Sequence, residues 1–304
     1  MKQELKTIPS ADGKLTLHVL IGAPETAPKG MVQLAHGMTE HKGRYVPFME
    51  FLAENGYASV IHDHRGHGES VNSKADLGYF SDETGTEIVK DLYEVTKLAK
   101  AEFPELPLYL FAHSMGTLVA RNYLKTHDDE VEKCILCGAP FQNDGAKIGL
   151  ALVERLEKRH GGHHRLRSVD KLVFGTYNRK FTDSKQPNRW ICSVSEVVER
   201  YNRCPKCNFK FTLNGYKNLF LLMKSCFDKT GWQCAAPVLP ILFLAGGNDP
   251  VIGNGNQFLA EMNFLQQVGY SSVKGMVYPG KRHELLNEDN KQTVMEDILS
   301  FLEK

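Results

Sequence analysis

The stretch LFAHSMG (residues 110–116) places a serine where an apolar run ends and a helical pattern begins. A sharp turn from a strand into a helix pushes a serine hydroxyl out of the sheet, where it can act as a nucleophile. Such a turn needs small flanking residues, and Ala112 and Gly116 provide them. The N-terminus of the following helix adds a positive dipole end near the hydroxyl. The stretch therefore predicts nucleophilic catalysis by Ser114.

A serine nucleophile needs a base and an acid, which in one common chain order follow it as acid and then histidine. Asp249 follows the apolar run LPILFLAGGN, and His283 follows VKGMVYPGKR. Because the carboxyl ends of parallel strands meet at one edge of a sheet, we expect Ser114, Asp249 and His283 to lie together. His283 would take the serine proton, and Asp249 would hold the imidazole in the required tautomer.

The tetrahedral intermediate of acyl transfer needs two backbone N–H donors. One is expected from Met115, the residue after the nucleophile. The other is expected from the loop AHGMTEHKGRY, where Gly37 permits a tight turn and Met38 offers its N–H. We therefore predict that Met38 and Met115 form an oxyanion hole.

The elements that must position these residues alternate between strands and helices. Continuous apolar runs predict buried parallel strands at 30–37, 57–66, 107–114, 133–140, 239–249 and 273–280, with an alternating strand at 14–22. Helical patterns occur at 45–56, 87–104, 117–127, 255–269 and 290–304. This alternation predicts an α/β fold, with a mostly parallel central sheet flanked by helices.

The alternation breaks between residues 141 and 236. This segment holds 18 Lys and Arg against 8 Asp and Glu, a net +10, whereas the rest holds 19 against 28, a net −9. It also contains five of the seven cysteines. We interpret residues 141–236 as a helical lid inserted into a core made of residues 1–140 and 237–304.

Five blocks carry a resemblance to a known family: HGMTEHKGRY, DHRGHGES, AHSMG, GGNDPV and KRHELLNE, in this order. They resemble the α/β-hydrolases, and within them the monoacylglycerol lipase and lysophospholipase-like branch, which is grouped with the serine aminopeptidases. The resemblance spans about residues 30–290 and implies an esterase or lipase with a lid after the sixth strand. It also implies a triad of Ser114, Asp249 and His283. The chain departs from the branch at Ala112, which stands for glycine, and at RCPKC (residues 203–207).

Two groups of residues resemble metal ligands. His62, His64 and His67 are interpreted as a polar loop that packs under the active site by hydrogen bonds, because no matching carboxylate or cysteine spacing surrounds them. Cys204-x-x-Cys207 is a stronger candidate for zinc, in a segment that also holds Cys192, His160, His163 and His164. Its spacing matches no standard zinc finger, so we expect a turn with one buried cysteine, and a zinc-clipped lid stays open as the alternative. We predict no cofactor.

The near-neutral net charge of +1 disfavours nucleic acid as a partner. Residues 141–236 carry an excess of basic residues, and apolar positions 148, 152, 153 and 156 lie on one predicted helical face. This pattern permits transient contact with anionic lipid. A solvated basic face without a partner is an equal alternative. An odd cysteine number and no apolar leader-like stretch in MKQELKTIPSADGK favour a cytoplasmic protein.

The sequence thus predicts a serine hydrolase that cleaves carboxylic esters through an acyl-enzyme. Its best substrates are expected to be esters of fatty acids with glycerol or a lysophospholipid. A peptidase or amidase and an acyltransferase can use the same triad and stay open as alternatives. A non-catalytic ligand receptor is disfavoured because all three triad members are present. Oligomeric state is left open.

Overall fold

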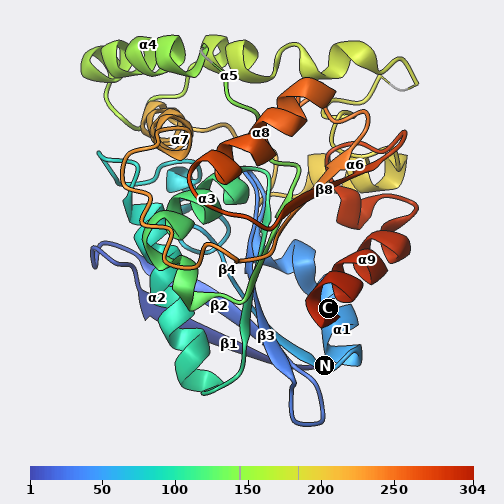
Figure 1. Ribbon diagram of the computed structural model, residues 1–304. Helices are drawn as coiled ribbons and strands as arrows, with labels where there is room; N and C mark the ends of the chain where they lie inside the picture. Colours follow the sequence, from blue (N-terminus) through green and yellow to red (C-terminus); the bar gives the residue numbers. More distant parts are fainter. Residues whose placement is uncertain (144, 184) are drawn as a thin grey trace.

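The computed structural model of the chain describes residues 1–143, 145–183 and 185–304. Its strands form one eight-stranded sheet in the order β1-β2-β4-β3-β5-β6-β7-β8 (Figure 1). The strands are β1 Lys2–Pro9, β2 Thr16–Ala23, β3 Gly30–Ala35, β4 Tyr57–His62, β5 Leu108–His113, β6 Lys133–Cys137, β7 Ile241–Gly246 and β8 Val273–Tyr278. All pairs from β4 to β8 across the sheet are parallel, and β2 pairs antiparallel with both β1 and β4. The predicted, mostly parallel sheet is confirmed.

The first strand was not predicted. β1 pairs with β2 along its full length, from Lys2 opposite Ala23 to Pro9 opposite Thr16. None of its residues is buried, because β1 lies at the edge of the sheet. An edge strand that buries neither face carries no continuous apolar run, which is the signal that identified the central strands.

Helices cover both faces of the sheet (Figure 1). Side chains of α1 Val46–Glu54 and α9 Lys291–Glu303 pack in one core cluster. Those of α2 Glu87–Glu102, α3 Met115–His127 and α8 Gly255–Gln267 pack in the other. Short 3-10 helices lie at Lys42–Tyr45, Lys74–Asp76, Asp128–Glu130, Tyr177–Lys180 and Leu285–Asn287. The three-layer arrangement leaves the carboxyl ends of the parallel strands free to carry a site.

We call residues 141–236, which lie between β6 and β7, the cap segment, and four α-helices occur in the part of it that the structure describes. They are α4 Gly145–His160, α5 Arg167–Phe174, α6 Ser195–Arg203 and α7 Leu213–Cys226. The asparagine Nδ2 of Asn122 in α3 donates to the carbonyl of Leu222 in α7 over 3.0 Å, which ties the cap segment to the core. Gly149 of α4 lies against the Phe220 ring, where a Cβ would come within 2.7 Å of the ring. That this segment is a separate lid domain stays a prediction.

The predicted apolar face of α4 is split in the structure. Val153 is buried and Leu156 half-buried, but Ile148 and Leu152 are exposed, with Ile148 at 74%. Ala146, Gly149 and Leu150 complete the buried side instead. The prediction that all four apolar positions share one face was wrong for Ile148 and Leu152. The small residues Ala146 and Gly149 lie on the buried side of α4 instead, and Gly149 packs against Phe220 of α7. Within the described residues, no helix has the length and apolar character required to cross a bilayer.

Candidate active site

Ser114 occupies the turn between β5 and α3. Its backbone has φ 52° and ψ −120°, a region that non-glycine residues rarely adopt and that marks a strained strand-to-helix turn. Gly116 is required there, because a Cβ would lie 2.3 Å from the carbonyl oxygen of Ala35 in the neighbouring strand. Ala112, fully buried two residues before the serine, fits where a larger residue would not. The turn aims Ser114 into the cavity described below.

The predicted acid and base lie together at the same edge of the sheet. His283 Nδ1 is 2.7 Å from Asp249 Oδ2, and both side chains are buried. The second carboxylate oxygen of Asp249 accepts the N–H of Val251 over 2.8 Å, which fixes the orientation of the carboxylate. Gly138 permits the close approach, since a Cβ would lie 3.0 Å from the imidazole.

Ser114 and His283 line the same cavity, yet no hydrogen bond joins them in the part of the chain that the structure describes. Serine–histidine hydrogen bonds often tighten only when substrate is bound, so this spacing does not remove His283 as a base. Trp190 of the cap segment packs against the His283 ring at 5.0 Å between centroids. The cap segment therefore contributes to the position of the imidazole.

The two predicted oxyanion donors flank Ser114. Met115 is the first residue of α3, so its N–H has no partner within the helix. Met38 lies in the loop after β3, and among the described residues neither N–H donates a hydrogen bond. Both residues line the cavity with Ser114. Two free N–H groups beside a hydroxyl suit the developing charge of an oxyanion.

Glu40 is a positioning residue that the sequence reasoning missed. Its Oε1 accepts the N–H of Gly37 over 2.5 Å and the hydroxyl of Tyr45 over 3.0 Å, and it lies 3.1 Å from His113 Nδ1. Burial would raise the pKa of Glu40, but His113 and Arg44 hold it well below its usual range. The carboxylate therefore stays charged and fixes the loop that carries Met38. The only sequence signal was the E-H-x-x-R-Y block, which gave no role.

Arg44 connects this loop to the segment that carries His283. It donates to Glu40 Oε2 over 2.7 Å and binds both oxygens of Glu284 over 2.7 and 2.6 Å. Burial opposes protonation of His113, but the Glu40 carboxylate outweighs it and raises the pKa of His113. The network thus joins the oxyanion loop to the histidine loop by charge-assisted hydrogen bonds, which are stronger than neutral ones.

These groups surround a cavity of about 410 Å³. Its polar lining includes Thr39, Glu40, His113 and Glu284, together with Ser114. Its other walls are mainly apolar side chains, most of them from the cap segment: Leu118, Ile148, Leu172, Val173, Phe174, Tyr177, Trp190, Leu219, Phe220 and Met223. The cavity therefore presents both apolar and polar side chains around the Ser114 hydroxyl.

The histidines near the loop after β4 form a buried cluster with His36. The rings of His36 and His64 are 4.4 Å apart, and those of His62 and His64 are 4.7 Å apart. His67 Nδ1 bonds the carbonyl of Arg65 over 3.0 Å, but neither ring nitrogen of His62 or His64 has a partner among the described residues. The predicted packing under the site is observed, whereas the expected hydrogen bonds are wrong for those two rings.

This cluster predicts loss of stability in mild acid. Burial lowers the pKa of His62 and of His67 to about 3, and lowers those of His36 and His64 too. Below pH 6.5 these histidines bind protons in the unfolded chain but stay neutral in the folded chain, so the free energy of unfolding falls as pH falls. Each histidine should cost about 1.4 kcal/mol per pH unit. The raised pKa of His113 adds no loss in this window.

Urea unfolding at several pH values between 7 and 5 measures this effect. The slope of unfolding free energy against pH should decrease in His62→Gln, which removes one buried imidazole. It should not change in His160→Gln, because His160 is exposed. A free energy that stays constant from pH 7 to 5 would contradict the expectation.

The chain is similar to known proteins in sequence and in fold. A family model described as "Serine aminopeptidase, S33" matches residues 26–290. The monoacylglycerol lipase of Mycolicibacterium smegmatis is 26% identical over 283 residues, 93% of this chain and 91% of the relative. The monoglyceride lipase homolog of Monkeypox virus is 34% identical over 284 residues, 92% and 91% of the two chains. The thermostable carboxyl esterase from Bacillus coagulans, solved in complex with glycerol, superposes with a TM-score of 0.91 at 30% identity, covering 100% and 98%.

Proposed function

The chain belongs to the serine aminopeptidase S33 family, in its monoacylglycerol lipase-like branch with the α/β-hydrolase fold, and we propose that it hydrolyses lipid esters through an acyl-enzyme. Ser114 is the proposed nucleophile, His283 the base and Asp249 the acid. Met38 and Met115 are the proposed oxyanion donors. The observation that carries the proposal is the cavity itself, which Ser114 and His283 line together with mainly apolar side chains of the cap segment.

The reaction follows from these positions. Ser114 Oγ bonds to the ester carbonyl carbon while its proton passes to His283 Nε2. The carbonyl oxygen becomes an oxyanion, which the N–H groups of Met38 and Met115 stabilise. His283 then protonates the leaving alcohol as the C–O bond breaks. Water, deprotonated by His283, releases the acid and restores Ser114.

The apolar and polar side chains that line the cavity suit a monoacylglycerol or a lysophospholipid. The apolar walls of the cap segment can bury an acyl chain, with about 0.8 kcal/mol gained per methylene. Thr39, which lines the cavity with Ser114, offers a hydroxyl for the hydroxyls of a glycerol leaving group. The named relatives are lipases and an esterase, which supports this substrate class.

A peptidase that recognises the free N-terminal amine of its substrate needs an unpaired carboxylate near the site to bind that amine. In the described residues that line the cavity, the cap segment contributes none. Glu40 and Glu284 lie there, but Arg44 pairs with both. This disfavours the peptidase alternative despite the name of the family. An acyltransferase, in which an alcohol replaces water, keeps the same geometry.

A substrate panel tests the proposal. Purified protein is assayed on p-nitrophenyl esters from acetate to palmitate, a 1-monoacylglycerol, a lysophospholipid and an aminoacyl anilide. We expect kcat/KM to rise by at least about 100-fold from acetate to medium-chain esters, because each buried methylene adds binding. Cleavage of the anilide with little ester turnover would establish the peptidase alternative. Ester consumption only with an added acceptor alcohol would establish an acyltransferase.

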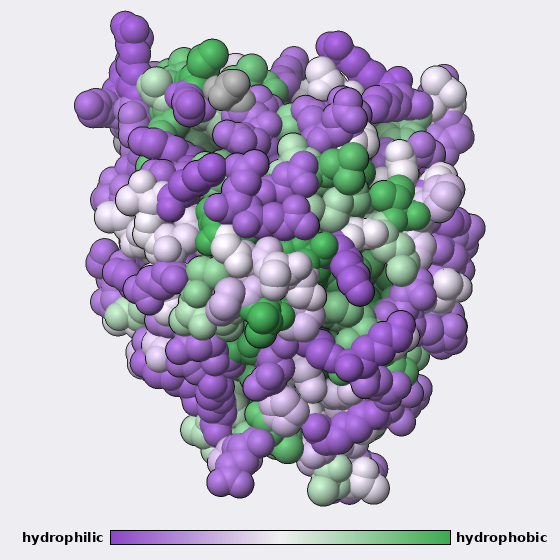
Figure 2. Space-filling model, viewed as in Figure 1, coloured by the Kyte–Doolittle hydropathy of each residue, from purple (hydrophilic) through white to green (hydrophobic). Residues whose placement is uncertain are grey.

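We further propose that the cap segment contacts anionic lipid. Ile148, Leu152 and Leu172 are exposed on α4 and α5, and Arg155, Lys158 and Arg159 are exposed on α4. Figure 2 shows hydrophobic residues among hydrophilic ones at the top of this view, where α4 lies in Figure 1. Basic side chains beside exposed apolar ones are typical of helices that lie on a membrane surface. The cytoplasmic location stays a prediction.

Vesicle assays test this contact. With monoacylglycerol in vesicles that contain anionic lipid, activity should fall about tenfold as salt rises from low to high, because each basic residue adds about 1 kcal/mol at low ionic strength. Ile148→Ser and Leu172→Ser should weaken vesicle binding. Leu5→Ser, at an equally exposed apolar position on β1, is the matched control. Activity that is independent of salt and of lipid charge would exclude the contact.

A further inference from the structure

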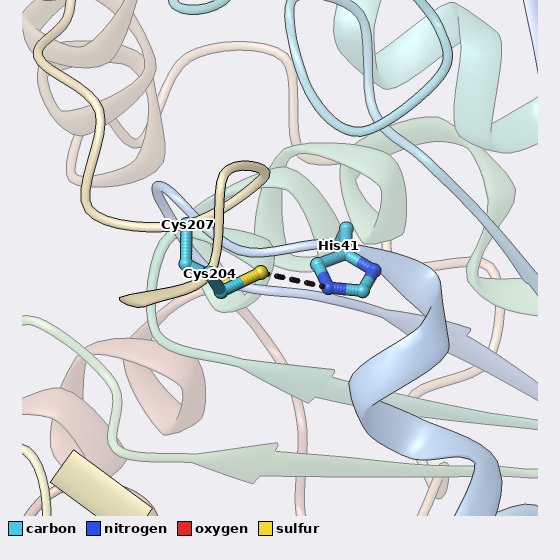
Figure 3. A group of neighbouring side chains, drawn as sticks. All are labelled: His41, Cys204 and Cys207. Atoms are coloured by element: carbon cyan, nitrogen blue, oxygen red, sulfur yellow. Dashed lines mark hydrogen bonds between the residues drawn. The ribbon is translucent and has the colours of Figure 1, made fainter. Parts of the chain in front are cut away.

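Three side chains from two distant segments converge beside the oxyanion loop. His41 follows Glu40, and Cys204 and Cys207 lie in the turn between α6 and α7. His41 Nε2 lies 3.6 Å from Cys204 Sγ, and one ligand atom of each residue lies within 4.8 Å of the others. Figure 3 shows the His41 imidazole facing the Cys204 sulfur, with the Cys207 side chain directed toward Cys204. No other such cluster occurs among the described residues.

We propose that His41, Cys204 and Cys207 bind a thiophilic divalent cation, Zn²⁺ in the first place, with a fourth position open to water. Thiolate sulfur and imidazole nitrogen are preferred zinc ligands. Zinc bond lengths place tetrahedral ligand atoms about 3.3–3.8 Å apart. The present separations therefore need adjustments of about 1 Å, within reach of side-chain rotation. The inference rests on this cluster alone and not on the proposed esterase activity.

The burial of the three residues suits an accessible site. Cys207 is buried in a small cluster with Val198 and Tyr201, whereas His41 and Cys204 are half-buried. The N–H of Cys207 donates to the carbonyl of Cys204 over 3.1 Å, which holds the C-x-x-C turn closed. This hydrogen bond positions the two cysteines for metal binding, and His41, outside the cap segment, is the third ligand of the proposed site.

Binding must rearrange protons. His41 Nδ1 now accepts the N–H of Gly43 over 3.2 Å, so Nε2 carries the proton that faces Cys204. When a cation binds Nε2, this proton moves to Nδ1 and the Gly43 hydrogen bond is lost. Both thiols lose their protons, so two protons are released for each cation bound. Below the thiol pKa values, affinity should rise about 100-fold per pH unit.

A disulfide is the other chemistry open to Cys204 and Cys207, and the surroundings favour it less. Disulfide exchange begins with a thiolate, and burial raises the pKa of the Cys207 thiol. A bound cation would offset the effect of burial, because its charge stabilises both thiolates, and this favours coordination.

An ion here would link the cap segment to the oxyanion loop. That link already has two hydrogen bonds: Thr39 Oγ1 lies 2.7 Å from the Tyr201 hydroxyl, and the Thr39 carbonyl accepts the N–H of Asn208 over 3.1 Å. Thr39 separates Met38 from Glu40, so the ion would act on the loop that holds one proposed oxyanion donor. Occupancy is therefore expected to raise thermal stability.

Metal titration of the full chain tests the proposal. Protein kept reduced is titrated with Co²⁺ as a spectroscopic probe and then with Zn²⁺ in competition. We expect one equivalent of cobalt to give a sulfur-to-metal charge-transfer band, which zinc displaces. Cys204→Ser and His41→Gln should each weaken binding by about 100-fold. Cys234→Ser, a half-buried cysteine away from the cluster, should bind like the parent chain.

Melting curves give an independent readout. Zn²⁺ should raise the Tm of the parent chain and of Cys234→Ser, but not that of Cys204→Ser, whose half-buried position tolerates the change. A reduced protein that binds no cobalt would overturn the proposal. So would a Cys204→Ser chain with unchanged affinity. A Cys204–Cys207 disulfide in protein that binds no cobalt when reduced would assign the pair to thiol chemistry instead.

Discussion

Ser114→Ala is expected to reduce kcat for p-nitrophenyl ester hydrolysis by about 10⁴- to 10⁶-fold, the range seen when a serine nucleophile is removed from such a triad. The hydroxyl lost is the atom that bonds the acyl group, and no other hydroxyl occupies the strained turn at φ 52°. KM should change little, because the apolar walls of the cavity remain. The residual rate comes from binding and the oxyanion donors.

Steady-state kinetics and labelling measure this result together. A fluorophosphonate, which reacts with activated serines, should label the parent chain and not Ser114→Ala. Ser195→Ala removes an exposed cap serine that hydrogen-bonds only Gln186 in the described contacts, and should keep parent activity. Circular dichroism should show both variants folded. Turnover in Ser114→Ala near the parent rate would end the acyl-enzyme proposal.

Asp249→Asn should lower kcat by about 10⁴-fold while preserving the local structure. The side-chain oxygen of asparagine can still accept the N–H of Val251, which Asp249 Oδ1 now does over 2.8 Å. Its NH₂ group then faces His283 Nδ1, which must become an acceptor. The imidazole proton is forced onto Nε2, on the side of Ser114, so the ring can no longer act as a base.

The pH dependence distinguishes this tautomer effect from misfolding. Activity of Asp249→Asn should recover partly at high pH, where hydroxide can replace the missing base, whereas an unfolded variant recovers nowhere. Asp289→Asn is the matched control, because Asp289 lies on the surface beyond His283 and pairs only with Lys281 among the described residues. An active Asp249→Asn chain would remove Asp249 from the proposed triad.

Much of this molecule was predictable from its sequence. Continuous apolar runs predicted the six strands from β3 to β8, and an alternating pattern predicted β2. Burial imposes a local pattern on consecutive residues, although the edge strand β8 turns out to be mostly exposed. Strand ends then predicted where Ser114, Asp249 and His283 would meet, since parallel strands present their carboxyl ends at one edge. The structure brings Ser114 and His283 to one cavity and places Asp249 against His283.

Other features depended on the tertiary structure. The Glu40–His113 contact joins residues 73 apart, and Arg44 reaches Glu284 across 240 residues. Cys204 and Cys207 were recognisable as a pair, yet nothing near them in the chain pointed to His41. The sequence also did not show which side of α4 is exposed, because that depends on how closely α7 packs against Gly149.

The sequence by itself thus determined where the strands end and which residues follow them, because the hydrophobic pattern of a strand involves only neighbouring residues. Only the tertiary structure decided which charges hold the oxyanion loop and which side chains surround the two cysteines. Hydrogen bonds and ligand clusters depend on distances of a few ångströms between segments far apart in the chain. No local pattern records those distances; they are set by how the cap segment and the core pack together.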